Sequence, residues 1–189
     1  MRAPDPPRDA ASAAEAIAAA LDARGCEFAL GGAIALGYWG DPRGTVDVDL
    51  TIFVPKDKPQ ECVRILQEAG FDAPAEPAIR SLEENGFCPV RWGGLRVDVF
   101  LPTIPFYGEA RARRRRVRLG NREVPVWSAE VLAVFKMMFF RLKDVADVDR
   151  ILRVQGERFD RTWVRERLVE IYGERDPRVA RWDELAAAK

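Results

Sequence analysis

The stretch that decides the fold is "ALGGAIALGYWGDPRGTVDVDLTIF", residues 29–53, which sets two glycines before a helical segment and two carboxylates in a strand. Residues 45–54 alternate in polarity and are rich in β-branched side chains, which predicts a half-buried strand ended by Pro55. In a strand, side chains at i and i+2 point to the same side. Asp47 and Asp49 should therefore share one face, while the apolar residues around them bury the other.

A third carboxylate stands in a matching context about fifty residues later, in "RVDVF". Asp98 lies there between two valines, so it too should face away from the core. If the two strands are neighbours, three carboxylates meet on one sheet surface, which a protein tolerates best where cations compensate the repulsion. The chain has no histidine, and hard carboxylate ligands suit Mg²⁺ or Mn²⁺. The alternative is that each aspartate is a solvated residue on an exposed strand face.

The glycine pair lies between a short strand, residues 26–30, and an apolar segment that reads as a helix. Backbone N–H groups in such a turn can cradle phosphate oxygens, helped by the helix N-terminus. Alternatively, Gly31 and Gly32 only make a tight turn that needs positive φ. Arg43 and Thr45 precede the acidic strand and could add a cation and a hydroxyl for phosphate, or could belong to a surface loop.

The rest of the chain predicts an α/β (α+β) fold: a mixed β-sheet core flanked by helices, with a C-terminal helical part. The helices expected from periodicity and capping residues span 11–24, 58–69, 144–154 and 160–172, with a further helix that starts at the N-cap Ser128. Two hairpins are expected, across Gly93-Gly94 and Gly120-Asn121. These elements divide the chain into a flexible tail (residues 1–10), an α/β core (residues 11–127) and a helical part packed on that core (residues 128–189).

Composition excludes several classes of protein. The formal net charge is zero, so attraction to nucleic acid over the whole surface is excluded, though a local patch is not. The absence of histidine excludes Ser-His and Cys-His catalysis and histidine-ligated metals. Three scattered cysteines do not suggest a disulfide framework. With no signal-peptide shape and no apolar stretch of about 18 residues, we expect a cytoplasmic protein without a membrane span.

These residues together resemble a known family. The glycine pair, "GDPRGTVDVDL", the strand with Asp98 and "SAEVLAVFKMMFFRLKDVADVDRIL" (residues 128–152) are similar to the nucleotidyltransferase superfamily related to DNA polymerase β. The match looks most like the small bacterial branch that includes abortive-infection and toxin–antitoxin nucleotidyltransferases. It covers roughly residues 26–152, and it implies Mg²⁺-dependent transfer of NMP from an NTP.

The resemblance also implies a role for each matching residue. Asp47 and Asp49 would bind two Mg²⁺ ions and the triphosphate, and Asp98 would bind the catalytic metal and help to deprotonate the acceptor hydroxyl. Gly31 and Gly32 would line the phosphate turn. Lys136, Lys143 and Asp144 would lie at the edge of the nucleotide site, with Lys136 as a catalytic residue. One departure is that many members of the superfamily have serine where this chain has Gly32, so Thr45 or Arg43 would have to replace its hydroxyl.

The two lysines can also be placed from helix geometry. If one helix runs unbroken from residue 128, Lys136 and Lys143 are seven residues apart and lie on nearly the same face, where two cations could meet a triphosphate. The alternative is a solvated face with Lys143 paired to Asp147 at i,i+4.

The strongest local charge bias is "EARARRRRVRLGNRE", residues 109–123. The arginines that could track a phosphate backbone are Arg111, Arg113, Arg114, Arg115, Arg116 and Arg118. Two alternatives stay open: charge that protects an exposed hairpin edge from strand pairing, and docking onto an acidic partner such as an antitoxin protein.

The predicted function is therefore Mg²⁺-dependent transfer of NMP to an acceptor hydroxyl, with RNA, in particular a tRNA 3′ end, as the preferred acceptor of a toxin-like enzyme. The alternatives are a small-molecule acceptor such as an antibiotic, a protein hydroxyl, or a catalytically degenerate nucleotide-binding partner protein.

Overall fold

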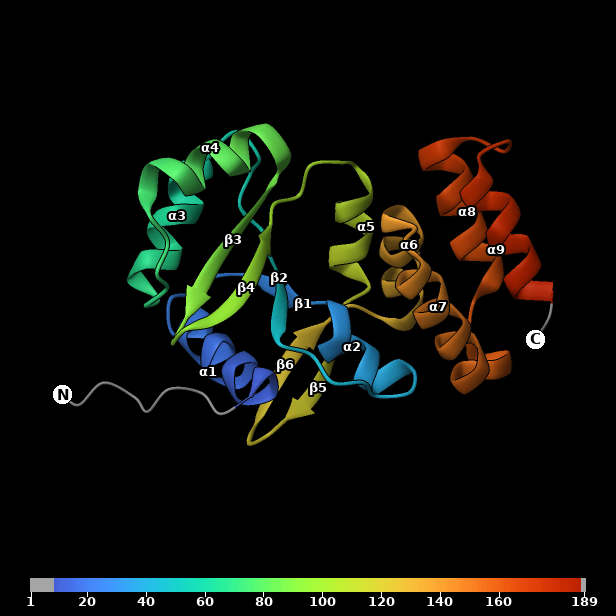
Figure 1. The fold of residues 1–189 in the computed structure, drawn as a ribbon, viewed down its shortest axis with the longest axis horizontal. Helices are drawn as coiled ribbons and strands as arrows, with labels where there is room; N and C mark the ends of the chain where they lie inside the picture. Colours follow the sequence, from blue (N-terminus) through green and yellow to red (C-terminus); the bar gives the residue numbers. More distant parts are fainter. Residues whose placement is uncertain (1–8, 188–189) are drawn as a thin grey trace.

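A mixed β-sheet forms the centre of the structure, a computed structural model that describes residues 9–187 (Figure 1). Within these residues the six strands lie in the order β3-β4-β2-β1-β6-β5. The pairs β2–β4 and β1–β6 are parallel and the other pairs are antiparallel. The strands are β1 (Phe28–Leu30), β2 (Asp47–Ile52), β3 (Phe87–Trp92), β4 (Leu95–Phe100), β5 (Arg115–Leu119) and β6 (Arg122–Val126). The predicted mixed sheet and both hairpins are confirmed.

Helices surround this sheet. They are α1 (Ala10–Asp22), α2 (Gly32–Trp39), α3 (Pro59–Glu68), α4 (Ala75–Asn85), α5 (Phe106–Ala112), α6 (Ala129–Phe139), α7 (Leu142–Gln155), α8 (Arg161–Tyr172) and α9 (Pro177–Ala187). Helix α1 packs against β2 and β6, while α6 and α7 pack against α2. Figure 1 shows α6 to α9 side by side at one end of the sheet.

One hydrophobic core joins the sheet to the C-terminal helices. It contains Leu30 and Val48 from the strands together with Val134 from α6 and Ile151 from α7, all fully buried. The predicted division at residue 128 therefore crosses a continuous core. Of the predicted tail, residues 1–8 lie outside the described residues, and Asp9 already caps α1 by accepting a hydrogen bond from the backbone N–H of Ser12.

The condition under which Lys136 and Lys143 would share a helix face, one unbroken helix from residue 128, is not met. Ser128 does cap α6, with its hydroxyl accepting from the N–H of Val131, but α6 ends where Phe140 adopts a left-handed backbone with φ of 55°. A new helix begins because Asp144 accepts from the N–H of Arg141 and receives its guanidinium, a capping arrangement that competes with continuation of α6. Leu142, the first residue of α7, is exposed as a result.

Helices α4, α5 and α9 were not predicted. Helix α5 has only seven residues, too few to show a period. Helices α4 and α9 begin at or next to prolines, at Pro74 and Pro177, which also read as loop signals. Among the described residues, no helix combines the length and the apolar character that a membrane span needs.

Candidate active site

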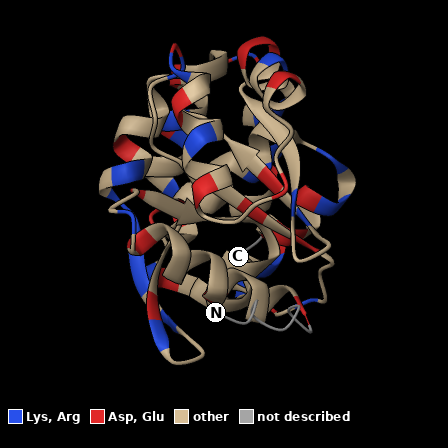
Figure 2. Ribbon diagram, turned by 90° about the vertical axis from the view of Figure 1, so that its left-hand side faces the viewer, with Lys and Arg blue, Asp and Glu red and all other residues tan. Residues whose placement is uncertain are grey.

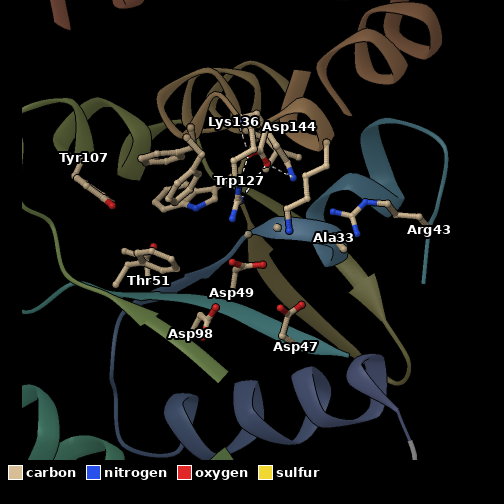
Figure 3. Close-up of a pocket in the computed structure, with 18 residues that line it drawn as sticks. Ala33, Arg43, Asp47, Asp49, Thr51, Asp98, Tyr107, Trp127, Lys136 and Asp144 are labelled. Atoms are coloured by element: carbon tan, nitrogen blue, oxygen red, sulfur yellow. Dashed lines mark hydrogen bonds and ion pairs between the residues drawn. The ribbon is translucent and has the colours of Figure 1, made fainter. Parts of the chain in front are cut away.

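A cleft opens over the face of the sheet that carries the aspartates. Asp47 and Asp49 on β2 and Asp98 on β4 all line it, and Figure 3 shows their side chains rising from the two strands toward Lys136. The empty space in the cleft is about 790 Å³, which includes open solvent. The predicted convergence of the three carboxylates is therefore present in the structure.

Strand register brings the carboxylates together. Strands β2 and β4 pair in parallel with Asp49 opposite Asp98, while Asp47 stands opposite Arg96. The intervening side chains Val48 and Leu50 are fully buried on the other face. The alternation that identified the strand thus also places the acidic residues, because core burial fixes which face they occupy.

The charges of this group are only partly compensated. Burial, followed by the neighbouring charge of Asp47, raises the pKa of Asp49 to about 6, against the opposing effect of Lys136. Asp98 is better balanced, since Arg96 Nε donates to its Oδ1 at 2.7 Å. The site therefore disfavours the charged form of one carboxylate at its centre.

The donor set suits a divalent cation, although the carboxylates do not yet surround one point. Across residues 9–187, no three acidic, cysteine or histidine side chains stand close enough together to hold one ion as they are. Mutual repulsion and the hydrogen bond from Arg96 account for this spread. The three carboxylates, of which Asp49 has the raised pKa, still match the chemistry of Mg²⁺ or Mn²⁺. Such ions bind carboxylate oxygens and would relieve the repulsion between them.

The glycine turn lies directly above Asp49. Gly31 is the N-cap of α2, and its N–H is already used by the backbone oxygen of Asp49 at 2.9 Å. The first amides inside α2, those of Gly32, Ala33 and Ile34, have no partner within the helix and form its positive end. These amides, rather than that of Gly31, are the donors available to a phosphate.

The structure explains why glycine and not serine stands at position 32. Gly32 has φ of 52°, and a Cβ built on it would lie 1.6 Å from Asp49 Oδ2. A serine there would need a different backbone and a displaced Asp49. The departure from the superfamily pattern is thus tied to the close approach of α2 to the central carboxylate. Gly31 is restricted less severely, by Trp127 at 3.1 Å.

A buried ion cluster connects Lys136 to the opposite wall of the cleft. Asp147 is 1% exposed and accepts from Lys136 Nζ at 2.7 Å, from Arg43 Nη2 at 3.1 Å and from Arg150 Nη1 at 3.0 Å. Burial alone would raise the pKa of Asp147, but the hydrogen bonds from Arg43 and Lys136 outweigh it and hold that pKa below its ordinary value. The alternative pairing of Asp147 with Lys143 is therefore wrong, since three other cations surround Asp147.

The remaining predicted residues fall into two groups. Lys143 lines the cleft and is exposed, so it could meet a triphosphate even though the helix is broken between it and Lys136. Asp144 also lines the cleft but is fully buried, and its oxygens are taken by Arg141 and by Lys136 at 3.5 Å. Thr45 is not among the cleft residues; its hydroxyl hydrogen-bonds to the Asp47 side chain and so can orient that carboxylate.

The arginine run lies apart from the cleft. None of its seven arginines lines that space, and β5 is the far edge strand, with β6 and β1 between it and β2. Figure 2 shows this charge along the hairpin that reaches the bottom of the view. Arg111 and Arg114 form ion pairs with Glu27, and Arg113 stacks over Trp163. The position on an edge strand agrees with the alternative that charge limits strand pairing there.

Sequence reasoning missed several residues of the cleft. Arg141 lines the cleft and was absent from the prediction. Asp147 is not among the lining residues and was considered only as a partner of Lys143, although two aspartates at i and i+3 on a helix are a signal for a shared partner, here Lys136. The aromatic residues of the cleft were also missed; they are Phe100, Tyr107, Trp127, Phe135 and Phe139. Nothing in their local sequence distinguishes them from core aromatics.

Solved structures of other proteins share this fold. No protein-family model matches the chain, and no curated protein matches it. A crystal structure of an antigenic nucleotidyltransferase-like protein from Paracoccidioides brasiliensis has 19% identity and a TM-score of 0.54, over 94% of this chain and 95% of that one. The solution structure of the antibiotic-resistance factor ANT(2″)-Ia has 15% identity and a TM-score of 0.55, over 94% and 89%. The crystal structure of ANT(2″)-Ia in complex with adenylyl-2″-tobramycin has 15% identity and a TM-score of 0.54, over 92% and 97%. The chain therefore has a nucleotidyltransferase-like fold, as the resemblance implied.

Proposed function

We propose that this protein is a Mg²⁺-dependent nucleotidyltransferase that moves NMP from an NTP to an acceptor hydroxyl and releases pyrophosphate. The observation that carries the proposal is the meeting of Asp47, Asp49 and Asp98 on adjacent parallel strands beneath the N-terminus of α2. A surface that only needed solubility would not gather three carboxylates, Lys136 and a helix N-terminus around one cleft.

The residues divide the work of the reaction among them. Asp47, Asp49 and Asp98 would hold Mg²⁺ or Mn²⁺, which when bound neutralises developing charge on the phosphoryl oxygens. The free amides at the start of α2 and the ammonium of Lys136 face the triphosphate, and Lys143 extends that positive wall to the cleft mouth. Asp98 accepts the proton of the acceptor hydroxyl while the oxygen of that hydroxyl bonds to the α-phosphorus. The bond between the α-phosphorus and the oxygen bridging to the β-phosphate breaks, and pyrophosphate leaves.

Nucleotide capture gives the first test of this proposal. The carboxylates alone repel a triphosphate, and Mg²⁺ turns that repulsion into a bridge, so NTP with Mg²⁺ should raise the melting temperature while NTP with EDTA should not. At a concentration about 100 times Kd the gain is roughly 2.7 kcal/mol, a shift on the order of 5 to 10 °C for a chain of this size. All four NTPs should be compared, with Mg²⁺ alone as the control. A shift that survives EDTA would contradict metal-bridged capture and favour the degenerate nucleotide-binding module.

For the acceptor, the structure favours a small hydroxyl-bearing molecule over RNA. Arg115, Arg116 and Arg118 lie on β5, which β6 and β1 separate from β2, and Arg111 and Arg114 already pair with Glu27. The neighbour crystallised with an adenylylated tobramycin supports a proposal of this acceptor class. A tRNA 3′ end remains the alternative, and a toxin-like role with an antitoxin partner would follow only from that alternative.

The salt dependence of RNA binding separates the two acceptors. Arg115, Arg116 and Arg118 on β5 are exposed, so changing them to glutamine should leave the Glu27 ion pairs and the fold intact. If the run does not guide RNA, bulk RNA should bind weakly and with the same salt slope before and after the change. If the logarithm of the binding constant instead falls more steeply with the logarithm of salt concentration in the wild type than in the variant, by roughly 0.7 for each lost phosphate contact, RNA is restored as the acceptor.

A further inference from the structure

The cleft has two chemically different ends. The end toward Arg43 and Lys143 is charged, whereas the opposite end is lined by neutral residues, namely Thr51, Phe100, Tyr107, Trp127, Leu132, Phe135 and Phe139. Figure 3 shows Tyr107 and Thr51 on one side of the three aspartates and Arg43 on the other. The two parts adjoin at Phe139, whose ring lies under the guanidinium of Arg141. A ligand that fills the whole cleft must therefore have a charged part and an uncharged part.

The neutral end contains polar groups that the protein leaves without partners. Thr51, Tyr107 and Trp127 are 4%, 9% and 3% exposed, and their side-chain hydroxyls and indole N–H make no hydrogen bond to any described residue. Among the described residues only Arg167 Nε and Arg178 Nε are buried side-chain polar atoms without a partner, so the two hydroxyls and the indole N–H are open to the cleft and to water there. All three line the cleft, and Figure 3 shows the Tyr107 hydroxyl directed into it. Water in the cleft can bond to these groups, and a ligand that enters can take its place.

The aromatic wall around these groups is held in place before any ligand arrives. The Trp127 ring lies 5.2 Å from Phe135, which in turn lies 5.1 Å from Tyr107. The Trp127 backbone is fixed on both sides, since its N–H donates to Leu30 and its carbonyl accepts from Trp39 Nε1 at 2.6 Å. A rigid aromatic pocket with a few convergent polar groups is the common form of a site for a small planar ligand.

We infer that this neutral end binds the nucleobase of the NTP and sets which base is used, an inference that rests on the proposed function. The phosphate turn adjoins it, because Trp127 contacts Gly31 at the start of α2, so a nucleoside attached to phosphates there reaches the aromatic wall. The lining there is mostly aromatic and carries no charge, which suits a planar base better than a cationic acceptor.

Two conservative variants test this inference. Thr51→Val and Tyr107→Phe each remove one hydroxyl with little change in volume, and each should weaken binding of the preferred Mg·NTP by about 3- to 10-fold, the loss expected for one hydrogen bond. The ratio of Kd between the best and the worst of the four NTPs should narrow, while the acceptor KM stays unchanged. Tyr38→Phe is the matched control, since its hydroxyl donates to the Arg118 carbonyl outside the cleft. Melting temperatures confirm that each variant folds.

Binding of the four free nucleosides without metal separates this inference from the proposed reaction. These probes have no phosphate, so they report on the base site alone. If calorimetry shows that a nucleoside binds the wild type and binds both variants more weakly by the same factor, the base site is supported even if no transfer is ever detected. The inference is overturned if no nucleoside binds the wild type, if both variants keep wild-type nucleotide affinities, or if the acceptor KM rises instead. Transfer with wild-type base preference in both variants would leave the reaction standing and remove only the base site.

Discussion

Replacing Asp49 with asparagine should reduce nucleotidyl transfer by about 1,000-fold or more while leaving the folded protein at least as stable as the wild type. Asp49 is the central carboxylate, opposite Asp98 and beneath the start of α2. Loss of a metal-binding carboxylate removes several kcal/mol of transition-state stabilisation, and each 1.36 kcal/mol is a factor of ten in rate. The measurement is the transfer rate at saturating NTP and Mg²⁺.

The same variant has a second readout, its stability as a function of pH. The folded-state pKa of Asp49 is raised to about 6 from an ordinary 3.8, so the folded wild type binds a proton that the unfolded chain has lost. Wild-type stability should fall as pH rises through that window, by roughly 3 kcal/mol at most, and the asparagine variant should lack this fall. Asp57→Asn, at an exposed turn outside the cleft, is the control. An active or strongly destabilised Asp49→Asn would contradict the role assigned to Asp49.

Replacing Asp147 with asparagine should have the opposite signature: a destabilised protein that still retains its metal ligands. Lys136 is buried and would lose its 2.7 Å partner, while Arg43 and Arg150 would lose a shared carboxylate. Removing one member of a buried ion cluster costs about 3 kcal/mol, which lowers the melting temperature of a chain of this size by roughly 6 to 12 °C. The KM for NTP should rise because Lys136 and Arg43 are no longer held in place.

The pH dependence of this destabilisation follows from the lowered pKa of Asp147. A carboxyl whose pKa is lower in the folded state stabilises above its unfolded pKa, here about 3.8, and that stability is lost as pH falls further. The difference between wild type and variant should thus be full at neutral pH and shrink below about pH 4. Glu68→Gln is the matched control, since its i,i+4 pair with Arg64 on α3 is solvent-exposed and worth little. Equal melting temperatures for Asp147→Asn and wild type would contradict the cluster's role.

The acidic face could be predicted from the sequence because its geometry is local. Alternation alone puts Asp47 and Asp49 on one side of a strand, and the same pattern places Asp98. The three carboxylates come together if the strand with Asp47 and Asp49 pairs with the strand with Asp98, and the same alternation in both strands suggested that pairing. The glycine turn was predictable in the same way, since Gly31 and Gly32 separate a strand pattern from a helical one.

The walls of the cleft could not be predicted because they depend on contacts between distant segments. Lys136 reaches Asp147 only because the chain turns at Phe140, and no helix-breaking residue marks that position. Arg43 was expected to meet phosphate, yet it also belongs to this ion cluster through Asp147. Tyr107 and Trp127 look like core aromatics in the sequence and differ from core residues only in lining the cleft.

The most direct test of nucleotidyl transfer is to follow the two ends of the NTP separately. Wild-type protein and Asp49→Asn are incubated with Mg²⁺, with each NTP labelled at either the α- or the γ-phosphate, and with bulk RNA or a panel of small hydroxyl-bearing acceptors. Attack at the α-phosphorus predicts that the α-label enters the acceptor, that the γ-label leaves in pyrophosphate, and that the variant does neither. Entry of the γ-label into the acceptor, or α-labelling that is unchanged in Asp49→Asn, would contradict this account.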